Sequence, residues 1–159
     1  MNEQVCLITG AASGIGAAAA RRLAVEGWTL ALVDVNGPAL SAVAATLAGA
    51  PATTVLDVAD EAGWARVEKG IRARFGALSG LVVNAGISDG GEIASIEFAR
   101  WRRLMSVNLD GAFLTLRTGL RLMRAGGAVV VMSSISGRKA EPGVGAYGAS
   151  KAALALLSR

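Results

Sequence analysis

Short apolar or β-branched runs recur along the chain, and each run ends at a glycine or a polar residue. The runs cover 5–8, 30–33, 53–56, 81–83 and 128–132. Such short, mostly apolar runs are typical of parallel strands buried on both faces. Apolar side chains at helical spacing follow the first run up to Gly27 and return at 61–75. Strands that alternate with helices predict an α/β fold with a doubly wound parallel sheet.

The longest amphipathic segment is predicted to be helical from 97 to 123. Its apolar members recur at helical spacing and are Trp101, Leu104, Met105, Leu109, Ala112, Phe113 and Leu116. Arginines occupy much of the remainder, namely Arg100, Arg102, Arg103, Arg117, Arg121 and Arg124. We interpret these cations as the solvated face of a helix and not as a surface for nucleic acid.

Composition fits one domain over residues 1–159, because 53% of the residues are hydrophobic, 18% are charged and no linker-like tract divides the chain. The formal net charge of +4 does not change this picture. With no histidine and 4% aromatic residues, neither base-stacking platforms nor histidine metal ligands are evident, so we expect no nucleic-acid partner and no metal site. Cys6 is the single cysteine and is expected to be a small core residue.

Export and membrane insertion are not predicted. Met1-Asn2-Glu3-Gln4 lacks a basic leader region, and no apolar stretch reaches the roughly 18 residues that a membrane helix needs. We therefore expect a cytoplasmic protein without a membrane partner.

A glycine-rich turn separates the first predicted strand from the first predicted helix. It reads Thr9-Gly10-Ala11-Ala12-Ser13-Gly14-Ile15-Gly16. Glycines allow the close approach of a pyrophosphate, and the helix N-terminus adds N–H donors and the positive end of a dipole. The predicted cofactor contacts are Gly10, Ser13, Gly14, Ile15 and Gly16. An ordinary glycine-rich connection is the alternative.

Asp34 ends the second predicted strand. A carboxylate at this place can accept hydrogen bonds from the adenosine ribose, and it repels the extra phosphate of NADP. No compensating cation is supplied by the neighbouring residues Ala11, Ala12, Ser13, Val35 and Asn36. NAD is therefore the predicted cofactor. The alternative interpretation is that Asp34 begins a turn with residues 36–38, and the two interpretations are compatible.

Tyr147 and Lys151 lie one turn apart on one helix face if the segment from 147 onward is helical, with about 5–6 Å between their Cβ atoms. An ammonium that close favours phenolate over phenol, as a general acid or base requires. Ser134 is predicted to hold the substrate oxygen, whereas Ser133 is expected to pack or to hydrogen-bond locally. No histidine is present to activate a serine, which disfavours a serine hydrolase.

These motifs resemble the signature of the short-chain dehydrogenase/reductase family: Thr-Gly-x-x-x-Gly-x-Gly, then a serine, then Tyr-x-x-x-Lys. The resemblance implies a Rossmann-type fold and an NAD-dependent oxidoreductase that acts on a secondary alcohol or ketone. It implies that Tyr147 moves the alcohol proton, that Ser134 orients the oxygen and that Lys151 also holds the nicotinamide ribose. Tyr147 and Lys151 are thus cofactor contacts as well.

Three further positions gain a role from the same resemblance. Asn108, in the family's Val-Asn pattern, would help to hold a water that leads to Lys151, which completes the catalytic set. Asp57 and Val58 would contact adenine, and the turn Asn84, Ala85 and Gly86 would close the sheet against the cofactor. The alternatives are a buried Asn108 satisfied by backbone, an Asp57 that caps a turn, and a Gly86 with positive φ.

The resemblance covers only the cofactor-binding and catalytic portion of the family's domain. We therefore expect a C-terminally incomplete sheet, with an uncovered edge at 128–132 and with candidate pocket walls at 88–92 and 137–141. The helices from 97 and from 147 correspond to the family's assembly surfaces, which implies a homodimer or homotetramer in a full-length form. The alternative to an enzyme is a dinucleotide-binding or assembly fragment without turnover.

Overall fold

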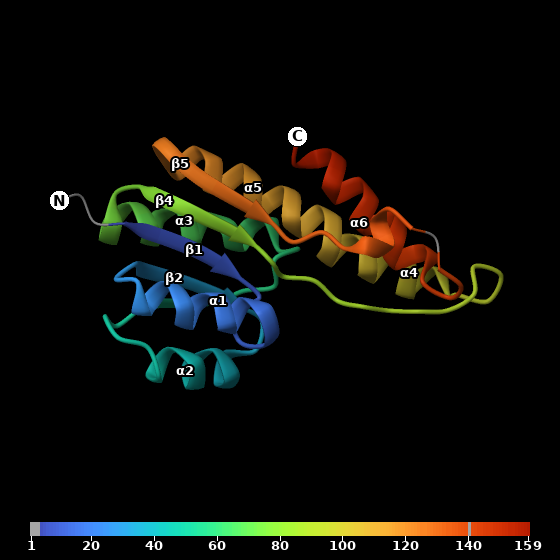
Figure 1. Cartoon of the computed structure of the whole chain (residues 1–159), viewed down its shortest axis with the longest axis horizontal. Coiled ribbons are helices and arrows are strands. Elements are labelled where there is room, and N and C mark those ends of the chain that lie inside the picture. The colour runs from blue at the N-terminus through green and yellow to red at the C-terminus, as the bar shows by residue number, and fades with distance from the viewer. Residues whose placement is uncertain (1–3, 140) are drawn as a thin grey trace.

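The computed structural model describes residues 4–139 and 141–159. Residues 1–3 of the N-terminal segment 1–4, for which no leader is expected, and Ala140 of the expected pocket wall lie outside this part. Five parallel strands form one sheet in the order β3-β2-β1-β4-β5 (Figure 1). Their bounds are Val5–Thr9 (β1), Thr29–Asp34 (β2), Ala52–Val55 (β3), Leu78–Val83 (β4) and Met123–Val131 (β5). The order reverses direction between β1 and β4, which is where doubly wound folds bind ligands, at the carboxyl ends of the strands.

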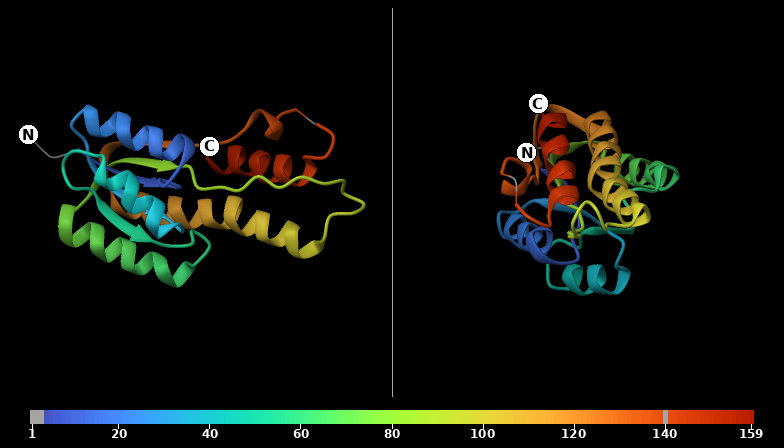
Figure 2. Two further views of the ribbon diagram at one scale, coloured as in Figure 1. Left: turned by 90° about the horizontal axis from the view of Figure 1, so that it is seen from below. Right: turned by 90° about the vertical axis from the view of Figure 1, so that its right-hand side faces the viewer.

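Helices cover both faces of the sheet. Helices α1 (Gly14–Val25) and α2 (Gly37–Ala45) lie on one face, and α3 (Glu61–Phe75) and α5 (Gly111–Leu122) lie on the other (Figure 2). The helix α4 (Phe98–Met105) continues through the π-helical turn Ser106–Asp110 into α5. The short 3₁₀ turn Ile135–Gly137 and the helix α6 (Gly145–Leu157) complete the chain beyond the carboxyl end of β5.

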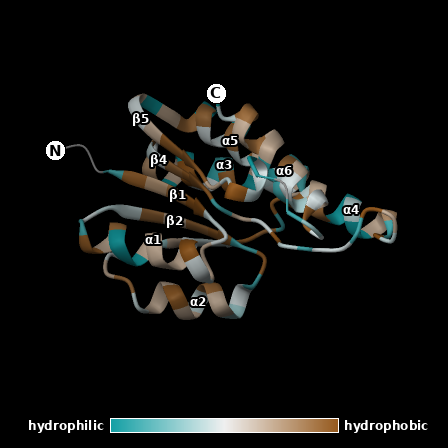
Figure 3. Ribbon diagram, turned by 45° about the vertical axis from the view of Figure 1, so that its right-hand side comes forward, coloured by the Kyte–Doolittle hydropathy of each residue, from teal (hydrophilic) through white to brown (hydrophobic). Residues whose placement is uncertain are grey.

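Burial of both strand faces explains why apolar and polar residues do not alternate along the predicted strands. Val5 and Leu7 of β1 pack into the core under α3 and α5, whereas Cys6 and Ile8 pack into the core under α1 and α2. Figure 3 shows apolar strands between the two helical layers. Cys6 is a core residue as expected, and burial raises the pKa of its thiol to about 12.

Side-chain caps set the start of two helices. Asn36 accepts a hydrogen bond from the Ala39 N–H at 3.1 Å and begins α2, so the predicted turn at 36–38 leads directly into a helix. Asp60 accepts from the Gly63 N–H at 3.0 Å and begins α3.

Three details differ from the sequence prediction. Strand β5 begins at Met123, because Met123 pairs with Leu78 across a register shift that the glycines at 126 and 127 accommodate. The helix predicted from 97 to 123 contains a π-helical turn at its centre. Phe113 of α5, expected on the buried face, is 47% exposed, since it lines a groove beside Val129 and Val131 of β5.

Strand β5 is the last strand on its side of the sheet among the described residues. Val130 is 51% exposed and Val129 is 38% exposed, so the expected uncovered edge is present. None of the helices in the described ranges is long and apolar enough to cross a membrane.

Candidate active site

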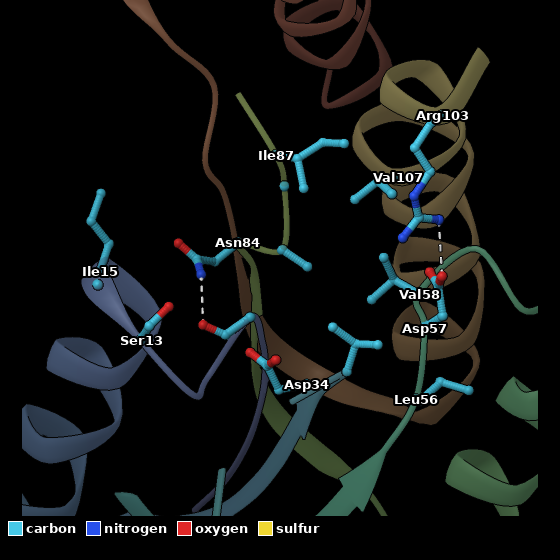
Figure 4. Close-up of a pocket in the computed structure, with 15 residues that line it drawn as sticks. Ser13, Ile15, Asp34, Leu56, Asp57, Val58, Asn84, Ile87, Arg103 and Val107 are labelled. Atoms are coloured by element: carbon cyan, nitrogen blue, oxygen red, sulfur yellow. Dashed lines mark hydrogen bonds and ion pairs between the residues drawn. The ribbon is translucent and has the colours of Figure 1, made fainter. Parts of the chain in front are cut away.

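A cleft of about 350 Å³ opens at the carboxyl ends of β1, β2, β3 and β4 (Figure 4). Every predicted cofactor contact except Gly16, Tyr147 and Lys151 lines it. The lining residues are Gly10, Ser13, Gly14, Ile15, Asp34, Val35, Leu56, Asp57, Val58, Asn84, Ala85, Gly86, Ile87, Arg103 and Val107. The cleft thus combines the glycine turn, the ends of three strands and the wall made by α4 and the π-helical turn.

The glycine turn is packed directly against the turn that follows β4. The Asn84 side-chain amide donates to the carbonyl oxygens of Thr9, at 3.0 Å, and of Gly10, at 3.2 Å. A Cβ on Gly16 would overlap the Gly10 carbonyl oxygen and lie 2.6 Å from Asn84 Nδ2, which explains the glycine there.

Thr9 is a buried residue of this contact that the sequence analysis left without a role. Its hydroxyl accepts from the backbone N–H groups of Asn84 and Ala85, at 3.1 and 3.2 Å, and donates to the Val82 carbonyl oxygen. The hydroxyl therefore holds the two turns in register. The only sequence signal for it is the threonine that opens the glycine motif.

Asp34 lies at the end of β2 and is held by two backbone groups. One carboxylate oxygen accepts from the Ala12 N–H and the other from the Asn36 N–H, both at 2.9 Å. Asp34 therefore both begins the turn at 36–38 and lines the cleft. The carboxylate is fixed next to the glycine turn, with lone pairs left for a further donor.

Asp57 is held in the same way on the opposite wall. Its carboxylate accepts from the Ala59 N–H at 3.0 Å and from the Arg103 guanidinium at 2.9 Å. Burial by itself would raise the pKa of Asp57, but the Ala59 N–H and Arg103 outweigh it and hold this pKa below its ordinary value. Arg103, interpreted from the sequence as part of a solvated face, is thus a cleft residue, and Figure 4 shows it pointing toward Asp57.

Asn108 is fully buried in the π-helical turn, and its side chain is satisfied by protein groups. Its amide donates to the Ile87 carbonyl oxygen at 2.9 Å and to the Ser150 hydroxyl at 3.1 Å, and its oxygen accepts from the Ile87 N–H at 2.8 Å. Ser150, which the sequence analysis did not single out, donates in turn to the Tyr147 carbonyl oxygen at 2.7 Å. Asn108 therefore ties the segment after β4 to α6.

Lys151 projects from α6 toward the cleft. Its ammonium donates to the Met132 carbonyl oxygen at 2.8 Å and lies 5.8 Å from the centre of the Tyr147 ring. A Cβ on Gly86 would lie 3.4 Å from Lys151 Nζ and 3.2 Å from Asn108 Oδ1, so both groups stand directly behind the cleft wall. Burial lowers the pKa of Lys151.

The two serines after β5 have different partners. The Ser133 hydroxyl donates to the Lys151 carbonyl oxygen at 2.9 Å and joins the strand end to α6, so its partner is not a local one. The Ser134 hydroxyl accepts from the Ser136 N–H at 3.2 Å and begins the 3₁₀ turn. No group of histidine, cysteine or acidic side chains that could hold a metal ion occurs within 4–139 and 141–159.

Comparison with known proteins places this geometry in a family. Residues 4–159 match the family model described as short chain dehydrogenase. The chain belongs to the short-chain dehydrogenase family. Its doubly wound sheet, predicted from the sequence, is confirmed by the strand order and by solved structures of the same family.

Individual members of the short-chain dehydrogenase family share about a third or more of the sequence. The chain is 41% identical over 162 residues to cis-4-hydroxycyclohexanecarboxylate dehydrogenase of Sinomonas cyclohexanicum, with 99% of this chain and 65% of the relative covered. It is 33% identical over 164 residues to an NADP-dependent (R)-specific alcohol dehydrogenase of Lentilactobacillus kefiri, with 100% and 65% covered. The structure of NAD⁺-bound xylitol dehydrogenase matches at 34% identity and a TM-score of 0.93, with 98% of this chain and 62% of that chain covered.

The chain therefore spans less than two thirds of the length of these short-chain dehydrogenases. One of them is described with NAD⁺ and another as NADP-dependent, so family membership alone does not select the cofactor.

Proposed function

We propose that the chain is the cofactor-binding and catalytic portion of an NAD-dependent oxidoreductase that acts on a secondary alcohol or ketone. The observation that carries this proposal is the position of the Lys151 ammonium. It stands behind Gly86, a residue of the cleft, and beside the Tyr147 ring. In this proposal the cleft holds the cofactor, and Tyr147 and Lys151 lie next to its nicotinamide end.

The start of α1 offers a place for the pyrophosphate of a dinucleotide. Ser13 makes no side-chain hydrogen bond to the start of α1, and open space lies over Gly14, which leaves the first N–H groups of the helix for a pyrophosphate. In this proposal the turn from Gly10 to Gly16 holds the pyrophosphate and Asp34 holds the adenosine ribose. Asp57 and Val58 contact adenine, while 84–86, Tyr147 and Lys151 hold the nicotinamide half. When bound, NAD supplies the hydride acceptor, and NADH supplies the donor.

The residues of the chain then handle the proton. Tyr147 Oη takes the proton of the substrate hydroxyl in oxidation and returns it in reduction, while Ser134 Oγ orients the substrate oxygen. The Lys151 ammonium lies beside the Tyr147 ring and would also hold the nicotinamide ribose. Because burial lowers the pKa of Lys151, this cation is lost at a lower pH than that of an exposed lysine. Asn108, through Ser150 and Ile87, fixes α6 against the cleft.

We infer a preference for NAD from Asp34. In this proposal a 2′-phosphate would bring a second negative charge next to the Asp34 carboxylate, which the Ala12 and Asn36 N–H groups hold in place. The Lentilactobacillus kefiri relative is NADP-dependent, so the preference of this chain has to be measured directly.

The test measures binding and turnover separately. Tyr147→Phe should leave the affinity for NADH unchanged in a fluorescence titration, because the ring and the cleft remain. In a full-length form it should lower the oxidation of secondary alcohols, followed by NADH absorbance, by about 10²–10⁴-fold, because the proton-transfer hydroxyl is lost. A fully active Tyr147→Phe variant would refute the assignment, and a wild-type chain that binds no NADH would refute the proposed function.

A second candidate function is dinucleotide binding without turnover. It is favoured by the edge of the sheet at β5, because Val129 and Val130 are exposed and no further strand pairs with β5 among the described residues. Tight binding of NADH, with no oxidation of any alcohol in a broad panel, would assign this function.

A further inference from the structure

The start of α6, which carries Tyr147, has no side-chain cap of its own. Val144 occupies the cap position and makes no side-chain hydrogen bond to the first turn. Gly143, Gly145 and Gly148 lie within four residues of Tyr147 in the chain. Glycine loses more conformational freedom than any other residue when it is ordered, so this stretch is costly to fix in one conformation. Contacts with other segments therefore have to hold Tyr147 in place.

The segment between β4 and α4 supplies such a contact. The Gly91 N–H donates to the Gly143 carbonyl oxygen at 2.7 Å, and a Cβ on Gly145 would lie 3.2 Å from Ile93 Cδ1. Gly143 has a φ of 75°, which an L side chain rarely adopts, so glycine is required at the point of contact. Figure 1 shows this segment and the start of α6 at the same end of the molecule.

Arg100 of α4 holds the same segment from its other side. Its Nε donates to Asp89 Oδ2 at 3.0 Å, and its Nη2 donates to Asp89 Oδ1 and, at 3.1 Å, to the Gly90 carbonyl oxygen. A planar guanidinium that binds both carboxylate oxygens fixes their orientation as well as their distance. Because α4 continues through the π-helical turn into α5, Arg100 stands on a long helical element. Residues 89–91 thus link α4 to the start of α6.

We propose that Arg100 is a positioning residue: through Asp89 and the hydrogen bond from Gly91 to Gly143, it fixes the first turn of α6 and thereby the place of the Tyr147 hydroxyl. This inference rests on the proposed function, because it concerns the acid–base role of Tyr147. Arg100 does not line the cofactor cleft, and it takes no part in hydride or proton transfer.

The ion pair is too exposed to serve mainly as a stabilising contact. The side chains of Arg100 and Asp89 are 49% and 26% exposed, and ion pairs at such positions contribute little to folding. Removal of Arg100 should therefore leave the unfolding midpoint in urea nearly unchanged. It should nevertheless affect catalysis, because misplacing a reacting group by about 1 Å can lower a rate by about 10²-fold.

Tyr147 is the only tyrosine in the chain, which makes it a direct reporter of this link. In protein that carries isotope-labelled tyrosine, every ring signal in an NMR spectrum comes from Tyr147. Arg100→Ala should shift or broaden these signals, since the first turn of α6 is then free to sample several positions. Arg100→Lys should restore them in part, because lysine keeps the charge without the planar fork. Arg102→Ala is the matched control, which removes the same charge from an exposed position of α4 and should leave the signals unchanged.

A pair of glycine substitutions tests the other end of the link. Gly143→Ala places a side chain at a φ of 75°, and Gly27→Ala does the same at 83° in the turn after α1, with no atom within 4 Å of either added group. Both variants should lower the unfolding midpoint by a similar amount, because the backbone strain is alike. Only Gly143→Ala should change the Tyr147 signals, and equal spectra for the two variants would contradict the link.

Turnover is measured in a full-length form. Arg100→Ala should lower kcat for secondary alcohols by about three- to tenfold, because the Tyr147 hydroxyl is less often in place. The affinity for NADH should stay within about twofold of the wild type, because the cleft is unchanged. Arg100→Lys should recover part of the lost kcat, and Arg102→Ala should keep both wild-type values.

The outcomes separate the two proposals. If the wild-type chain binds no NADH, or if Tyr147→Phe is fully active, the proposed function fails and the role of Arg100 fails with it. If Tyr147→Phe is inactive but Arg100→Ala and Arg102→Ala behave alike in ring signals or in kcat, only the role of Arg100 is overturned.

Discussion

At the scale of single residues, the candidate side chains are held by backbone groups of other segments without any ligand. Asp34 is fixed by Ala12 and Asn36, and Asn108 is fixed by Ile87. Side chains fixed in this way lose little freedom when a ligand binds, which favours affinity and selectivity. As a consequence, a substitution at Asp34 or Asn108 should also destabilise the segments that these side chains hold.

Asp34 provides the residue-scale prediction. If its charge excludes the 2′-phosphate, the chain should bind NADH at least about tenfold more tightly than NADPH. Asp34→Asn keeps an acceptor oxygen but removes the charge, so it should narrow this preference. Asp34→Ala should in addition weaken the binding of both cofactors, because the Ala12 N–H loses its partner. The measurement is a pair of fluorescence titrations for each variant, and equal wild-type affinities would remove Asp34 from this role.

At the scale of elements, two irregular segments build the site between regular ones. The glycine turn places β1 and α1 against Asn84, and the π-helical turn between α4 and α5 holds Asn108 next to Ser150 of α6. π-Helical turns occur frequently at functional sites. The regular helices and strands position these two irregular segments. The contacts that the two segments make determine the shape of the cleft.

A pair of glycine substitutions tests this view of the turn. Gly16→Ala would place a methyl group onto the Gly10 carbonyl oxygen and against Asn84, so it should destabilise the fold by about 1–3 kcal/mol and weaken NADH binding. Gly70→Ala is the control within α3, where no atom lies within 4 Å of the added group. It should stabilise the fold by about 0.5–1 kcal/mol and leave binding unchanged. Urea unfolding and NADH titration measure both effects, and a Gly16→Ala variant as stable as the wild type would contradict the packing argument.

At the scale of the whole molecule, β5 forms one edge of the sheet. Strand β5 has no neighbour beyond it among the described residues, and the groove beside it is lined by Phe113, Leu116, Leu120 and Leu157. An exposed, apolar parallel edge is a place where chains associate. The homodimer or homotetramer, the cytoplasmic location and the single domain stay predictions.

The open edge gives the molecular-scale prediction. The 159-residue chain should self-associate as its concentration rises, and Val130→Lys should reduce this association, because a charge on an edge strand opposes pairing. Val25→Lys on α1, where Val25 is 83% exposed and far from β5 in sequence, is the matched control and should not change it. Sedimentation velocity of the three chains is the measurement. Equal association of all three would show that the edge is not the contact.

Much of the site could be predicted because its signals are local. The strand, turn and helix around Gly10 to Gly16 follow from short-range periodicity and from the conformations that only glycine adopts. The four-residue interval between Tyr147 and Lys151 places both on one helix face, and the structure includes both in α6. The family relation rests on the same motifs and matches residues 4–159.

The remainder was decided by contacts between segments far apart in the chain. The arginine pattern at 100–103 is equally compatible with a solvated helix face, and only the tertiary arrangement brings Arg103 of α4 to Asp57, which follows β3. The start of β5 depends on its pairing with Leu78, and the role of the Thr9 hydroxyl depends on a turn 75 residues later. Sequence by itself therefore determined the elements, the family and the types of chemistry. Tertiary structure decided which polar groups meet, because hydrogen bonds and ion pairs require distances that only the assembled sheet and helices provide.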